Sequence, residues 1–299
     1  MYQQIDSNKR KSILLMLLFI IIISGLVYAW SLYYGTGSYI VVLAFIIASV
    51  MSLISFYAGD KVALAQAGAR QIKREDNKYV WRMVENLSIT AGVPMPKVYI
   101  INDPSMNAFA TGRDPNHSSI ALTTGLIENL KNEELEGVIA HELSHVKNYD
   151  IRLMMIVIIC VGIITLLADW MIRSAIWGGR GRSSKNNGNV LIIIGLVLAV
   201  LSPLFAKLIQ LAVSRKREFL ADASGAMLTR YPEGLARALE KISAQNQPLR
   251  RANKATAHLY ISNPLKKTSK FFSTHPPVDQ RIKYLRSGFS PNDHEQHAK

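Results

Sequence analysis

The distribution of apolar residues separates long uncharged runs from stretches in which apolar and polar residues alternate at helical or strand spacing. Four runs approach or exceed the roughly twenty residues that cross a bilayer, and they span residues 12–34, 38–59, 153–172 and 190–213. Asp169 and Lys207 lie towards the ends of the last two runs, where a charged side chain can reach the membrane interface. The pattern therefore predicts four hydrophobic membrane segments.

Basic residues gather beside these runs. The net charge of +14 would suit nucleic acid, but Lys and Arg cluster at residues 9–11, 70–74 and 215–217, as in the cytoplasmic loops of membrane proteins. We therefore expect the lipid bilayer, and no nucleic acid, as a partner. Residues 35–37 carry no Lys or Arg, so this loop should lie outside. The N-terminus and the chain after Gly59 should then lie in the cytoplasm.

Two features leave alternatives open for the membrane segments. The first run follows three basic residues and ends near a weak small-residue cleavage site at residues 27–29, as a signal peptide does. The run is long for that purpose, so we expect a retained helix. The loop at residues 178–189 carries Arg180, Arg182 and Lys185, against the charge rule. The depth of the second hairpin therefore stays open.

Outside the apolar runs, the spacing predicts a mainly α fold with a small β-sheet. Strands are expected at residues 97–102 and 118–123. Helices are expected at residues 61–78, 79–91, 132–150, 215–228 and 232–245, with a short last helix ending near residue 285. The expected parts are an N-terminal transmembrane hairpin (1–60), a first soluble part (61–152), a second membrane hairpin (153–213), a second soluble part (214–286) and a solvated tail (287–299).

Residues 132–150 carry the clearest chemical signal. Acidic residues in the first turn, after a possible Asn132 cap, favour the start of a helix. His141 and His145 are four residues apart, so a helix projects both imidazoles to one side, close enough to bind one tetrahedral metal ion. Glu142 points about 100° away and can act as a base without being a ligand. The alternative is an ordinary polar helix face.

A catalytic zinc needs a third protein ligand, and two carboxylates are available in the segment REFLAD at residues 217–222. Glu218 and Asp222 are four residues apart on a predicted helix, so one can bind the metal while the other orients a histidine. A solvated acidic pair beside Arg215 and Arg217 is the alternative. Spacing alone does not choose between the two carboxylates.

Four motifs make the chain resemble the HtpX membrane zinc proteases, which are relatives of the type I CAAX prenyl proteases. They are NAFATG at residues 107–112, AHELSHVKNYD at 140–150, REFLAD at 217–222 and THPPVDQRI at 274–282. Their joint occurrence in this order, over nearly the whole chain, makes the resemblance specific. It implies a gluzincin-like protease domain that faces the cytoplasm of the bacterial inner membrane and degrades damaged or misfolded membrane proteins during stress.

The resemblance also implies the metal site. One zinc ion per chain is expected on His141, His145 and Glu218. Asp222 is expected to orient one of the two histidine ligands without binding the metal itself. The metal should lower the pKa of its water to about 7 and polarise the scissile carbonyl. Glu142 is the expected general base, which takes the proton of this water and passes it to the leaving amine.

Two further roles follow from the resemblance. His275 is the candidate donor to the oxyanion, on a turn fixed by Pro276 and Pro277, although a structural turn histidine is the alternative. Asn107, Ala108 and Phe109 are expected to pair with the substrate backbone as an added strand, a mode that tolerates many sequences.

Two other function classes share parts of this pattern. A CAAX-type enzyme would use the same zinc chemistry but needs a chamber for a prenyl group, and four apolar segments are few to enclose one. A membrane scaffold with a structural zinc needs a closed fourth ligand, which the chain does not obviously supply.

The charge pattern predicts that both soluble parts face the cytoplasm. A reporter that works only in the cytoplasm, fused after Lys299, should therefore be active, because the basic clusters hold their segments on that side. Activity of a fused reporter that works only outside the cytoplasm would reverse this orientation.

Overall fold

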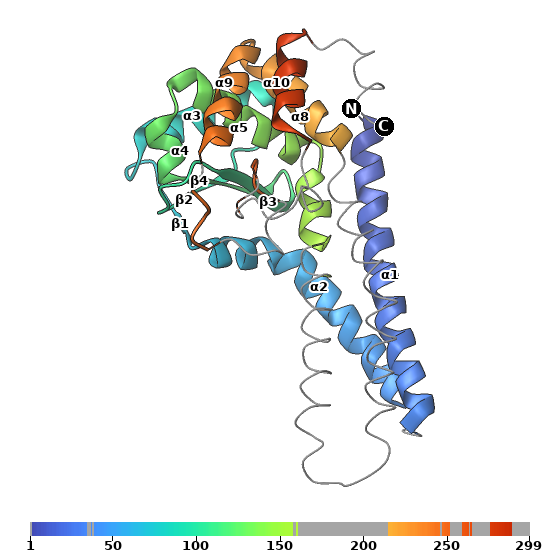
Figure 1. The fold of residues 1–299 in the computed structure, drawn as a ribbon. Helices are drawn as coiled ribbons and strands as arrows, with labels where there is room; N and C mark the ends of the chain where they lie inside the picture. Colours follow the sequence, from blue (N-terminus) through green and yellow to red (C-terminus); the bar gives the residue numbers. More distant parts are fainter. Residues whose placement is uncertain are drawn as a thin grey trace.

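The computed structural model describes residues 2–34, 37, 39–157, 160, 215–245, 247–251, 259–262, 264 and 276–288. A long hairpin of α1 (Tyr2–Tyr34) and α2 (Tyr39–Ala67) extends from a domain of shorter helices and a four-stranded sheet (Figure 1). The predicted mainly α fold with a small sheet is confirmed. The N-terminal end of α1 lies beside the domain, near α8 (Figure 1).

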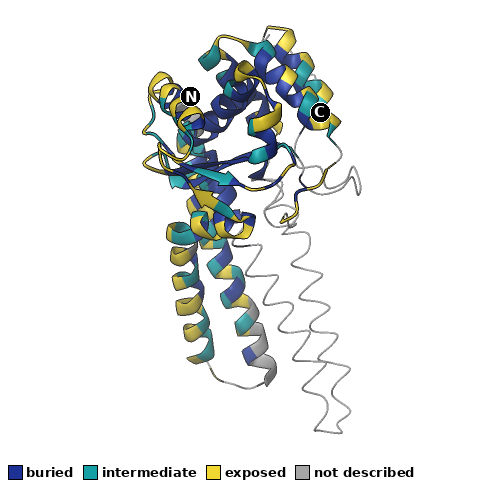
Figure 2. Ribbon diagram, turned by 90° about the vertical axis from the view of Figure 1, so that its left-hand side faces the viewer, coloured by how far each residue is buried: buried dark blue, intermediate teal, exposed yellow. Residues whose placement is uncertain are grey.

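The hairpin leaves large apolar side chains exposed along its length (Figure 2). They include Ile13, Leu14, Leu17 and Ile21 on α1 and Val42, Phe45, Ile46 and Leu53 on α2. Among the described residues, no single helix combines the length and apolar composition of a membrane span. The pieces Tyr39–Ile54 and Phe56–Ala67 pass that test only together, across a bend of 63° and by length and composition alone.

The four predicted membrane segments are thus not shown by the structure. Most of the third segment and all of the fourth lie outside the described residues. The charged loop at residues 178–189 lies outside them too, so the depth of the second hairpin stays a prediction.

The sheet has the order β1-β2-β4-β3. Its strands are β1 (Ala69–Gln71), β2 (Lys97–Ile101), β3 (Ala108–Asp114) and β4 (His117–Thr123). β2 runs parallel to β4, while β1 and β3 are antiparallel to their neighbours. The predicted strands at 97–102 and 118–123 are confirmed as β2 and β4, and β3 forms one edge of the sheet.

The two faces of the sheet bury different neighbours, because side chains alternate along a strand. Ala108, Ala110 and Ile120 face the main core, which contains α3 (Lys78–Ala91) and α5 (Asn132–Lys147). Phe109 and Ala121 face the other way, towards the end of α2. The sheet therefore lies between the helices of the domain and the hairpin of α1 and α2 (Figure 1).

One predicted helix is correct only over its first part. The pattern at residues 61–78 predicts a helix, but α2 ends at Ala67 and the chain enters β1 at Ala69. Gly68 has φ +67, a left-handed conformation that glycine adopts without steric cost and that ends a helix. Ala69 then pairs with Ile101 of β2, so a sheet contact overrides the helical composition.

The predicted helix at 132–150 is shorter than expected. α5 begins at Asn132, so Asn132 is not the cap; Lys131 occupies that position, and its backbone N–H donates to Glu134 at 2.7 Å. α5 ends at Lys147, and helical structure resumes at residue 150. Tyr149 interrupts it with φ 61, a left-handed conformation that is unfavourable for a bulky residue.

Three helices are described among residues 215–286; the first two pack on α5, and the third packs on those two. They are α8 (Arg215–Thr229), α9 (Pro232–Ala244) and α10 (Val278–Arg286), close to the predicted bounds; the short α4 (Thr124–Asn129) follows β4. A glycine allows each close approach to α5. A Cβ on Gly225 of α8 would lie 2.9 Å from the backbone nitrogen of His141, and one on Gly137 of α5 would lie 2.7 Å from that of Leu235.

The Gly225→Ala variant should therefore be destabilised, because a new methyl group would press against the backbone of α5 rather than a movable side chain. We expect a loss of about 1–3 kcal/mol and a lower melting temperature in detergent. Gly25→Ala in α1 is the matched control, since nothing lies within 4 Å of its Cβ position. Equal melting temperatures for the two variants would contradict the close packing of α8 on α5.

Candidate metal centre

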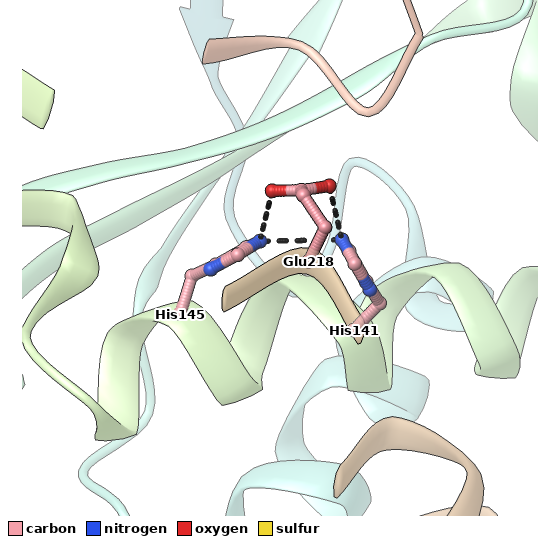
Figure 3. Close-up of side chains that lie close together, drawn as sticks. All are labelled: His141, His145 and Glu218. Carbon is pink, nitrogen blue, oxygen red and sulfur yellow. Dashed lines mark hydrogen bonds and ion pairs between the residues drawn. The ribbon is translucent and has the colours of Figure 1, made fainter. Parts of the chain in front are cut away.

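The structure brings the three predicted metal ligands together. His141 and His145 rise from one face of α5, and Glu218 of α8 points between them (Figure 3). The two Nε2 atoms are 3.2 Å apart, and the Glu218 carboxylate oxygens lie 3.5 Å from Nε2 of His145 and 3.9 Å from Nε2 of His141. All three side chains are buried.

This donor set fits a zinc ion. Two nitrogens that bind one tetrahedral zinc at about 2.0–2.1 Å lie about 3.3–3.4 Å apart, close to the separation of the two Nε2 atoms. One ligand atom from each of the three residues lies within 4.8 Å of the others. Three protein ligands leave a position for a water or a substrate, as catalytic zinc sites require.

Asp222 holds His141 from the opposite side. Its Oδ1 lies 2.9 Å from Nδ1 of His141. Burial lowers the pKa of His141, against the opposing effect of Asp222, and this direction favours the neutral imidazole that a metal ligand must be. Glu218 therefore faces the ligand nitrogens, while Asp222 faces the other nitrogen of one ring.

Arg281 of α10 pairs with Asp222 in a bidentate contact. Its Nε and Nη2 atoms donate to the two Asp222 oxygens at 2.8 and 2.7 Å, and its side chain is 0% exposed. Burial opposes the charge of each partner, yet their attraction prevails: the pKa of Asp222 is lowered and that of Arg281 is raised. Arg281 Nη1 also lies 3.5 Å from Glu218, so one guanidinium contacts both carboxylates of α8.

Asp150 holds His145 in a corresponding way. Its Oδ2 lies 3.1 Å from Nδ1 of His145, and its Oδ1 accepts a hydrogen bond from the side-chain amide of Asn8 at 2.7 Å. Burial lowers the pKa of His145, but the carboxylates of Asp150 and Glu218 outweigh it and raise that pKa to about 9. A metal ion must therefore displace a proton from His145 in the metal-free protein.

The charges around the two imidazoles also suit a divalent cation. The described buried groups here are four carboxylates and two guanidiniums: Glu142, Asp150, Glu218, Asp222, Arg217 and Arg281. When all six groups are ionised, their net charge is −2, and burial makes such an excess of charge costly. A bound zinc ion would neutralise them.

Glu142 lies on α5 beside β3. The backbone N–H of Ala110 donates a hydrogen bond to its carboxylate. Burial raises the pKa of Glu142 to about 7, and the nearby Glu218 adds to the rise against the opposing effect of His145. A carboxylate with a pKa near the working pH suits a general base.

The predicted substrate-binding residues lie at the edge of the sheet, but part of that edge is already paired. The backbone N–H of Ile261 donates to the carbonyl of Ala108 at 3.0 Å, and the Asn107 amide donates to the carbonyl of Ser262 at 3.0 Å. The Phe109 ring packs on Tyr260, 5.0 Å between centroids. A substrate strand at Asn107 and Ala108 would therefore have to replace residues 261–262.

Three residues that support the site were not predicted from the sequence. Asp150 and Arg281 stand within the motifs AHELSHVKNYD and THPPVDQRI, and this membership could have identified them as site residues. Asn8 gives no local signal, because it lies in a polar stretch ahead of an apolar run. His275, the predicted oxyanion donor, lies outside the described residues.

Comparison with known proteins decides the family. Residues 74–288 match Peptidase family M48. The chain belongs to this family. The M48 match contains His141, His145 and Glu218, which form the cluster that could hold a metal ion.

Relatives support this membership. The M48 chain is 47% identical over 287 residues to the "Protease HtpX homolog" of Dictyoglomus turgidum, covering 95% of this chain and 94% of the relative. It is 45% identical over 288 residues to the protein of the same name from Tropheryma whipplei, covering 96% and 98%. The resemblance to HtpX is thus confirmed.

The crystal structure of S. mikatae Ste24p shares the fold. The TM-score is 0.50 at 20% identity, over 95% of this chain and 67% of that one.

The geometry predicts that replacing each of the two carboxylates of α8 weakens zinc binding to a different extent. Glu218→Gln should purify with almost no zinc, because it removes a donor oxygen from the ligand cluster. Asp222→Asn should retain zinc at saturating concentration with about 10–100-fold weaker affinity, since Asp222 faces only the outer nitrogen of His141. Metal content and chelator competition measure both; a zinc-loaded Glu218→Gln beside a zinc-free Asp222→Asn would reverse the assignment.

Proposed function

We propose that this M48 protein is an integral-membrane zinc endopeptidase that degrades damaged or misfolded membrane proteins. The observation that carries the proposal is the buried cluster of His141, His145 and Glu218, with Glu142 next to it on the same helix. A zinc ion on these ligands would lower the pKa of a bound water to about 7 and polarise the scissile carbonyl.

The protein's own groups handle the proton and orient the ligands. Glu142 takes the proton from the attacking water and delivers it to the leaving amine, and its pKa of about 7 permits both steps near neutral pH. Asp222 and Asp150 keep the outer nitrogens of His141 and His145 engaged, so that each ring presents Nε2 to the ligand cluster. His275 remains our candidate for the oxyanion donor.

We propose that the substrate extends along the outer edge of β3, where it would cross in front of Glu142. The contact between Ala110 and Glu142 supports this, because it places the edge backbone beside the base. Main-chain pairing depends little on the identity of the side chains. It therefore suits substrates of many different sequences that share only the loss of their fold. Residues 261–262 occupy the Asn107–Ala108 end of this edge, so the substrate would have to displace them to use its full length.

Residence in the bacterial inner membrane, with the protease domain in the cytoplasm, belongs to the same proposal. The exposed apolar side chains of α1 and α2 support it, since a large apolar surface in water is unfavourable. The basic clusters beside the predicted segments support the orientation. The domain lies at one end of the hairpin, where it would meet segments of membrane proteins that emerge on that side (Figure 1).

Glu142→Gln should bind zinc at the wild-type stoichiometry and lose about 10²–10⁴-fold in turnover, because it removes the base but no ligand. The assay incubates the zinc-loaded protein with an unfolded protein, with and without a chelator, and follows cleavage. Glu133→Gln is the matched control: it changes an exposed carboxylate in the first turn of the same helix and should leave turnover unchanged.

Two results would count against the proposal. Normal proteolysis by Glu142→Gln would exclude Glu142 as the base. A wild-type protein that binds zinc and cleaves nothing would point to the alternative of a structural zinc in a membrane scaffold.

A further inference from the structure

The break in the helix after α5 positions Asp150, which contacts one of the histidines of the metal centre. Asn148 and Tyr149 leave the helical path, and Tyr149 has φ 61, which is strained for a bulky residue. Helical structure resumes at Asp150, whose carboxylate turns back to Nδ1 of His145. In an uninterrupted helix, residues five apart do not lie on one face, so this contact depends on the break.

A single side chain from α1 spans the break. The amide nitrogen of Asn8 donates to the carbonyl of Asn148 at 2.9 Å and to Oδ1 of Asp150 at 2.7 Å. An asparagine amide has two N–H donors, and both are used here. Asn8 is 2% exposed, so water does not compete with these contacts.

The adjoining residue of α1 contacts the same break. Lys9 Nζ lies 4.6 Å from the centre of the Tyr149 ring, and Arg152 lies over the same ring at 5.0 Å. Such contacts between a cation and an aromatic face are attractive. Two cations thus contact the strained residue, and one of them belongs to α1.

Asp150 joins three helices through its two oxygens. Oδ2 contacts His145 of α5, while Oδ1 accepts from Asn8 of α1 and lies 3.5 Å from Arg217 of α8. Arg217 precedes Glu218, the third member of the ligand cluster. A change at Asn8 would therefore be transmitted to His145 through one buried carboxylate.

We propose that Asn8, 142 residues away from Asp150 in the sequence, is a positioning residue of the metal centre. It fixes Asp150, and through it the orientation of His145. The inference rests on the proposed zinc site. It makes the N-terminal helix, outside the residues matched to family M48, part of the machinery that holds the metal.

The test measures zinc affinity of the full-length protein in detergent, by competition with a chromophoric chelator. Asn8→Leu removes both donors at similar size and should weaken zinc binding about 10-fold, the low end for partners of metal ligands. Asn8→Asp sets a second carboxylate against Asp150 and should weaken binding further. The absorption spectrum of the cobalt-substituted protein should shift in both variants, because it reports ligand geometry.

Ser12→Ala is the matched control. Ser12 is buried one turn further along α1 and donates only to the backbone carbonyl of Asn8, so its loss should leave affinity and spectrum unchanged. If Asn8→Leu does not fold, Asn8→Ser, which keeps one donor, should show an intermediate loss of affinity. Wild-type affinity in the folded Asn8 variants, or an equal loss in Ser12→Ala, would overturn the proposal.

A double-mutant cycle tests whether Asn8 affects zinc binding through Asp150. In an Asp150→Asn background, Asn8→Leu should cause little additional loss, because Asn8 acts through the Asp150 carboxylate. If the two substitutions weaken zinc binding by independent factors in the double variant, Asn8 does not act through Asp150. Failure of the proposed function would look different: zinc would bind as expected and the protein would cleave nothing.

Discussion

An ionised carboxylate that leaves water must find donors or opposite charge, and the centre of this M48 domain buries four carboxylates around two imidazoles. Each of them finds its partner on another element. Asp222 of α8 pairs with Arg281 of α10, and Asp150 pairs with Asn8 of α1. The need to satisfy these groups links α1, α5, α8 and α10 into one unit.

Close backbone packing makes this linkage possible. Gly225 lets α8 approach His141 closely enough for Glu218 and Asp222 to reach opposite sides of the same histidine. The sheet sets the other boundary of the site, since β3 presents its edge to Glu142. Glu142, the ligand cluster and a strand edge therefore meet at one place, and the proposed cleavage with main-chain recognition depends on this arrangement.

Helix α5 and its two imidazoles were predictable from the sequence because they depend on local spacing, and the strands β2 and β4 followed from short β-branched runs. The helix expected at residues 61–78 ends early, at Ala67, and the cap at Asn132 was wrong. In the first case, Gly68 and the pairing of Ala69 with Ile101 overrode a helical composition. In the second, Lys131 provides the cap position, with a hydrogen bond to Glu134.

The sequence by itself determined the residues that can bind a metal, the neighbouring base and the alternation of apolar and soluble stretches, since each is a property of spacing along the chain. Only the tertiary structure decided that Glu218 faces the ligand nitrogens while Asp222 turns to Arg281, because the two carboxylates share one helix face and differ only in what lies opposite. It also decided the place of Asn8, whose partner Asp150 is reached through a break in a helix that local propensity would have continued.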